Sequence, residues 1–109
     1  MANKTKLNFS YEGKDYTLEF TRKTVKQMED SGFIPSRIVD APMTVLPDLF
    51  AGSFLANHKF TKRDLIDEIF DNMKGKRELV DLLSKMYHEP LAALMEEGDE
   101  GNGIEWTAE

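Results

Sequence analysis

The chain has 109 residues and a mass of 12.5 kDa, which suits one domain with one modest hydrophobic core. It carries 14 Lys and Arg against 20 Asp and Glu, and it has no cysteine, so disulfides and thiolate metal sites are excluded. No segment approaches the ~20 apolar residues of a membrane span, and the N-terminal residues have no apolar run typical of a signal peptide. We therefore expect a cytoplasmic protein.

The net charge of -6 comes from the C-terminal residues. Without them the chain holds equal numbers of acids and bases, because six acids and no base lie from residue 96 onward (Glu96, Glu97, Asp99, Glu100, Glu105, Glu109). A neutral body has no general attraction for nucleic acid or for an anionic membrane. We expect residues 1–97 to form a single globular domain and residues 98–109 to form an acidic, flexible tail.

The N-terminal residues predict a β-hairpin. Apolar side chains alternate with polar ones in two runs (Leu7, Phe9, Tyr11, then Tyr16, Leu18, Phe20), which is the pattern of half-buried strands. A turn at Gly13 and Lys14 pairs Tyr11 with Tyr16 and places both runs on one face. Because a lone hairpin is marginally stable, this face should pack on helices or on a partner's sheet.

Two helices begin with the similar patterns FTRK and FTKR. Thr21 and Thr61 are the expected N-caps, and in each case a phenylalanine before the cap is positioned to contact an apolar residue in the first turns. Gly32 should end the first of these helices. The flanking residues share no further period, so we interpret the two patterns as independent uses of one cap.

Two more helical segments are expected, one on each side of the second of these helices. The first should begin near Thr44 with Pro47 in its first turn, and its small residues around Gly52 should open a groove for another backbone. The second begins after Gly75, and Pro90 marks either a kink or the start of a short last helix. The predicted fold class is α+β, an N-terminal β-hairpin followed by about four helices.

The residues indicate no catalytic, cofactor or metal site. His58 and His88 have no second ligand at metal spacing, and we interpret both as helix-end histidines. The glycines fit turns better than a phosphate loop, and the acids between residues 64 and 71 fit a solvated helix face. No serine lies in a nucleophile motif. An enzyme is therefore not expected.

Basic pairs at two helix starts are candidates for protein binding. Arg22 with Lys23 and Lys62 with Arg63 oppose the helix dipole by a few tenths of a kcal/mol each. They are either solvated side chains that strong caps tolerate or a docking site for an acidic segment.

Apolar residues supply two further binding candidates. The hairpin and the helix that carries Phe50, Gly52 and Phe54 are expected to form a binding or self-association surface. Ile104 and Trp106 lie two residues apart in the acidic tail, so an extended chain presents both on one side. Such a segment either orders on another molecule or folds back on its own chain. The six Met and seven Phe either provide adaptable binding surface or fill gaps in the core.

Three stretches together resemble a known family: LNFSYEGKDYTLEFTRKTVKQMEDSGF, PMTVLPDLFAGSFLANHKFTKRDLIDEIF and MYHEPLAALMEEGDEGNGIEW. The chain is similar to tail assembly chaperone-like proteins encoded in the tail modules of long-tailed phages and prophages of Gram-positive bacteria. The resemblance implies a non-enzymatic factor in the host cytoplasm that holds the tape measure protein, with tube subunits as further partners, during tail morphogenesis. Members of such families can self-associate and can also be made as a longer frameshifted product. The alternative is a structural virion component, such as a head-tail connector or tail tube subunit.

Overall fold

The computed structural model describes residues 5–95 and 107–108. An antiparallel hairpin precedes four α-helices and one short 3-10 helix in this part of the chain, which confirms the predicted α+β fold. In chain order the elements are β1 (Leu7–Tyr11), β2 (Lys14–Leu18), α1 (Arg22–Asp30), η1 (Pro35–Ile38), α2 (Pro42–Gly52), α3 (Arg63–Asn72) and α4 (Lys76–Met95).

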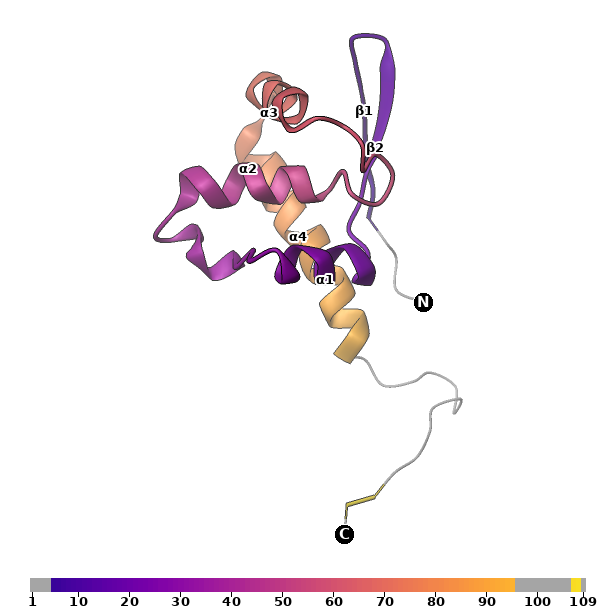
Figure 1. Ribbon diagram of the computed structural model, residues 1–109, viewed down its shortest axis with the longest axis vertical. Coiled ribbons are helices and arrows are strands. Elements are labelled where there is room, and N and C mark those ends of the chain that lie inside the picture. Colours follow the sequence, from indigo (N-terminus) through magenta and orange to yellow (C-terminus); the bar gives the residue numbers. More distant parts are fainter. Residues whose placement is uncertain (1–4, 96–106, 109) are drawn as a thin grey trace.

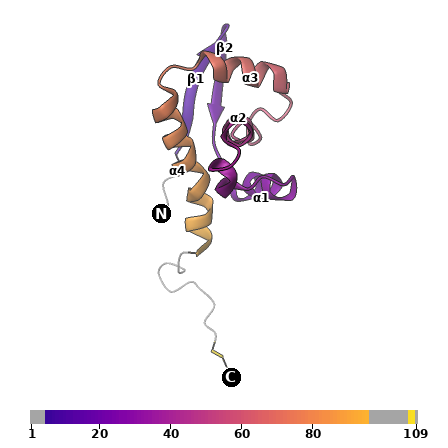
Figure 2. The same ribbon diagram turned by 90° about the vertical axis from the view of Figure 1, so that its left-hand side faces the viewer.

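The hairpin stands beside the helical part of the molecule, and α4 runs behind α1 and α2 (Figure 1). The side view also places α4 at one side, with α2 and α3 beside it (Figure 2). Within the described ranges, no helix combines the length and the apolar character that crossing a membrane requires.

The hairpin has a different turn from the predicted one. Glu12 and Gly13 are the two turn residues, with φ of 49° and 80°, and positive φ at both positions is the turn geometry that matches the twist of paired strands. The observed pairs are Leu7 with Leu18, Phe9 with Tyr16, and Tyr11 with Lys14. The predicted register was therefore wrong by two residues. Because side chains alternate with a period of two, the same apolar residues still share one face.

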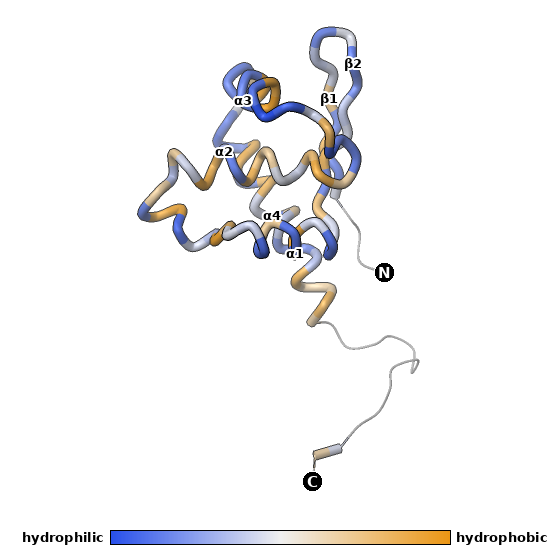
Figure 3. Tube along the Cα trace, viewed as in Figure 1, coloured by the Kyte–Doolittle hydropathy of each residue, from blue (hydrophilic) through white to orange (hydrophobic). Residues whose placement is uncertain are grey.

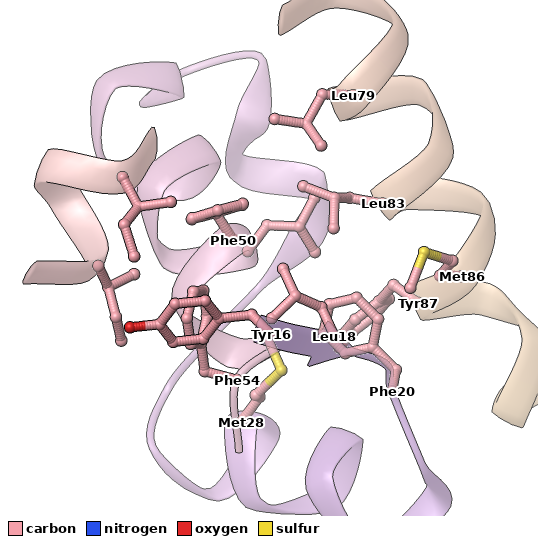
Figure 4. Close-up of a cluster of buried hydrophobic side chains, with 13 residues drawn as sticks. Tyr16, Leu18, Phe20, Met28, Phe50, Phe54, Leu79, Leu83, Met86 and Tyr87 are labelled. Atoms are coloured by element: carbon pink, nitrogen blue, oxygen red, sulfur yellow. The ribbon is translucent and has the colours of Figure 1, made fainter. Parts of the chain in front are cut away.

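The core lies where this face meets the helices (Figure 4). Leu18, Phe50 and Leu83 are fully buried, and they come from β2, α2 and α4. Rings pack edge to face around them, for example Phe20 against Tyr87 with centroids 5.4 Å apart. The hairpin is thus held by helices of its own chain, which was one of the two arrangements expected.

The two similar helix starts have different structures. Thr21 caps α1 as predicted, and a reciprocal bond from the Thr21 N–H to Thr24 Oγ1 of 2.9 Å completes a capping box. The predicted cap at Thr61 is wrong, because the Thr61 N–H donates to the His58 carbonyl in a turn and α3 begins one residue later, with Lys62 as N-cap and no side-chain cap bond. This difference supports two independent starts.

Two proline positions also differ from expectation. Helix α2 starts at Pro42, with Ala41 as N-cap, so Pro47 lies inside the helix and the predicted start near Thr44 was wrong. Pro42 is suited to the first helical position because its missing N–H would have no partner there. Helix α4 is continuous through Pro90. Of the two readings of Pro90, the short separate helix is therefore not observed.

Candidate functional site

An open groove with a volume of about 1510 Å³ lies on the surface between α1, α2 and residues 53–65. We call it the α1–α2 groove. Its apolar lining consists of Met28, Phe33, Ala51, Gly52, Leu55, Ala56, Phe60 and Leu65. No residue of α4 (Lys76–Met95) lines it. The groove therefore opens on a part of the molecule that the longest helix does not cover.

The rim of the groove is basic. Its lining includes five cationic residues (Lys14, Lys23, Lys59, Lys62, Arg63) and two acids (Asp30, Asp48), which gives an excess of three positive charges. Lys23 and Lys62 are exposed, and no ion pair involves either of them among residues 5–95. Because the body as a whole is neutral, this local excess is a specific feature of the groove.

Arg63 differs from the other cations of the rim because it is held by two carboxylates. Its guanidinium lies 2.8 Å from Asp48 of α2 and 2.9 Å from Asp67 of α3. Partial burial lowers the pKa of Arg63, but the hydrogen bonds to Asp67 and Asp48 outweigh burial and the net pKa is raised. Arg63 therefore joins α2 to α3. Because its charge is already paired with two carboxylates, Arg63 is less available than Lys62 for an ion pair with a partner.

Phe60 is the exposed aromatic residue of the groove, with 89% of its surface accessible. The sequence placed it as a packing residue before a cap at Thr61. With α3 starting at Arg63 instead, Phe60 is left in the connection, where the Lys59 ammonium lies 5.1 Å from its ring centroid. An exposed ring beside cations and an apolar floor is the composition of a protein-binding site.

The structure corrects the expected surface around Gly52. Phe50 is fully buried, Phe54 is 1% exposed, and Gly52 is buried as well. The space beside Gly52 is occupied by the Met28 side chain, whose terminal atoms a Cβ at position 52 would overlap. Met28 of the same chain therefore occupies the space that was expected to receive another backbone. Phe50 and Phe54 belong to the core.

The proposed receivers of an acidic segment fall into two groups. Lys23, Lys62 and Arg63 come from different helix starts and meet on the same groove, whereas Arg22 is exposed outside it. Ile104 and Trp106 lie outside the described residues. The structure thus brings together three of the four basic residues that the sequence singled out.

His58 has a role that the sequence did not reveal. It is in the connection after α2, and its Nε2 accepts a 3.1 Å hydrogen bond from the Thr17 N–H of β2. The neighbouring Asn57 side chain donates to the Thr17 carbonyl at 3.1 Å. These two side chains occupy the outer edge of β2 and leave less backbone open to another strand.

His88 lies on the exposed part of α4, where its Nδ1 is 2.7 Å from the Ser84 carbonyl. Its ring also meets Tyr87, with centroids 5.6 Å apart. Neither histidine belongs to a group of metal-ligating side chains in the described part of the chain.

The groove itself was not predictable from sequence patterns. Its wall between residues 53 and 62 has no helical or strand period, and its position depends on tertiary hydrogen bonds such as Glu19 N–H to the Ser53 carbonyl, 3.2 Å. The only local signal was the cluster of Lys59, Phe60 and Lys62, an aromatic residue among cations.

Comparison with protein families finds a match. A family model described as a domain of unknown function, DUF5055, covers residues 1–109. A search of curated proteins found no match, and a search of solved structures found none either.

Proposed function

Since the chain belongs to the DUF5055 family along its whole length, whose description assigns no activity, we propose from its own residues that it is a non-enzymatic assembly chaperone of phage tails. Its client is the tape measure protein, with tube subunits as further partners, in the cytoplasm of the host. The resemblance of three sequence stretches to tail assembly chaperone-like proteins supports this proposal. The α1–α2 groove supports the part of it that concerns protein binding.

The observation that carries the binding role is the mixed lining of the groove. A holding protein needs adaptable apolar contacts that do not depend on one client geometry. Phe33 and Leu55 are half-buried in the lining, and Phe60 is almost fully exposed. Flexible lysines at the rim favour acidic client segments without fixing a single pose.

Coexpression with the tape measure protein from the same tail module tests the holding function. We expect the tape measure protein to remain soluble and to copurify with this chain, and to aggregate when it is expressed alone. A tape measure protein that is equally insoluble in both cases would contradict the proposal.

Mass spectrometry of mature virions separates the chaperone from the alternative, a structural connector or tube subunit. A chaperone leaves when the tube has polymerised, so the chain should be absent from purified particles. Finding the chain there in stoichiometric amounts would contradict the chaperone proposal and favour a structural component of the virion.

A further inference from the structure

We infer that the α1–α2 groove binds residues 96–109 of a second copy of this chain, so that the protein associates with itself through its C-terminal segment. The inference concerns the same groove as the proposed function. Its test requires only the purified chain, without any client.

Charge complementarity is the first argument. The groove lining has an excess of three positive charges, and residues 96–109 hold six acids and no base. Lys23 and Lys62, which line the groove at the starts of α1 and α3, make no ion pair within residues 5–95. An acidic segment placed between them gains attraction without first breaking a bond within the body.

Apolar complementarity is the second argument. The groove offers the half-buried Phe33 and Leu55 and the exposed Phe60 as lining, and the C-terminal segment offers Ile104 and the single tryptophan, Trp106. Aromatic anchors in apolar pockets supply most of the binding energy in many interfaces, whereas charges at the rim mainly speed the encounter and fix the orientation. One short segment therefore satisfies both parts of the lining.

The end of α4 favours a second copy over the same chain as the source of the segment. Leu91, Leu94 and Met95 are 53%, 48% and 76% exposed, and Figure 3 shows apolar colouring at this end of α4. Leu91 and Leu94 lie one helical turn apart, so they lie on one face of the helix, directly before the acidic segment. A second copy covers this face when its groove takes up the segment.

Complementation between two full-length variants tests the inference. The groove variant carries Lys23→Glu and Lys62→Glu, and the segment variant carries Ile104→Ser and Trp106→Ser. We expect the wild-type chain to dimerise in sedimentation experiments and each variant alone to dimerise at least about tenfold more weakly. A mixture of the two should associate again, because one supplies an intact groove and the other an intact segment.

Arg22→Glu with Arg77→Glu is the matched control, since it makes the same charge change at two exposed helix starts outside the groove. This control should dimerise like the wild type. Circular dichroism of every variant checks that the fold is retained.

Three results would overturn the inference. They are a wild-type chain that stays monomeric at all concentrations, a dimer that the segment variant leaves intact, and a monomer whose Trp106 fluorescence responds to Lys23→Glu. The last result places the segment in the groove of its own chain. These experiments contain no client, so a negative result does not contradict the chaperone proposal. The coexpression experiment tests that proposal separately.

Discussion

At the scale of single residues, His58 and His88 have the same chemistry but different structural roles. His58 satisfies a backbone N–H of β2 and meets the Tyr16 ring at 5.1 Å between centroids, whereas the exposed His88 bonds to the Ser84 carbonyl of its own helix. The sequence context of both residues, a histidine beside charged neighbours, is similar. Only the tertiary position of the connection after α2 distinguishes them.

This difference predicts that substitution of His58 lowers the stability of the fold more than substitution of His88. His58→Ala leaves the Thr17 N–H without its acceptor, which should lower the free energy of unfolding by about 1–3 kcal/mol. His88→Ala changes an exposed side chain and should stay within about 0.5 kcal/mol of the wild type. Urea denaturation of both variants measures the difference, and equal effects would show that the His58 bond contributes nothing to stability.

Gly52 and Met28 give a second prediction at this scale. Gly52→Ala places a methyl group on the terminal atoms of Met28, and such overpacking costs about 1–3 kcal/mol. Met28→Ala alone should also destabilise, because it leaves a cavity. The double variant should be less destabilised than the two single effects combined, since the new methyl group occupies part of that cavity. Additive effects in a double-mutant cycle would contradict the observed contact.

At the scale of elements, the tip of the hairpin is tied to α3 through one hydrogen bond. Tyr11 donates its hydroxyl proton to the Glu68 carboxylate. This hydrogen bond, followed by desolvation and the negative charge of Glu68, raises the pKa of Tyr11 to about 12. An unperturbed tyrosine titrates near pH ~10. The folded chain therefore keeps Tyr11 protonated at a pH where the unfolded chain does not.

The sign of the resulting pH dependence follows from this raised value. The stabilisation is fully present below pH ~10 and is lost as the pH rises through about 12, where the folded state also ionises. In a phenolate absorbance titration, the difference between the wild type and Tyr11→Phe should therefore have its midpoint near pH ~12. Glu68→Gln in the wild-type background should move that midpoint down. A midpoint near pH ~10 would mean that the hairpin tip is free in solution.

The elements themselves were largely predictable because their signals are local. Alternation predicted both strands, and the Thr21 cap and Gly32 predicted the two ends of α1. The predictions were wrong for the turn residues of the hairpin, the start of α2 and the cap of α3. In each case neighbouring residues offered two acceptable solutions, such as Pro42 or Pro47 in a first turn, and long-range packing selected one. The groove was less predictable, because three of its basic residues meet only after α1, α2 and α3 have packed.

At the scale of the whole molecule, the charges are separated rather than balanced locally. The acids from residue 96 onward carry the whole net charge of -6, while the α1–α2 groove concentrates positive charge on a neutral body. This separation supports reversible binding: the same groove can take a C-terminal segment of another copy or an acidic segment of a client. Competition between them would keep the groove occupied until a client arrives.

Salt should therefore weaken association. Charges at an exposed rim are screened at high ionic strength, so dimerisation of the full chain should become weaker as sodium chloride rises from about 0.05 M to about 0.5 M. Sedimentation equilibrium measures this change. Association through apolar contacts alone would be unchanged or stronger at high salt, and that result would remove the electrostatic part of the account.

We propose the α1–α2 groove as the site that binds other proteins. The most direct measurement is the affinity of the purified full-length chain for the tape measure protein, compared between Lys23→Glu/Lys62→Glu and the control Arg22→Glu/Arg77→Glu. We expect at least about a tenfold loss of affinity for the groove variant and wild-type affinity for the control, with both variants folded. Equal affinities of the two variants would contradict it and would move the binding site elsewhere on the molecule.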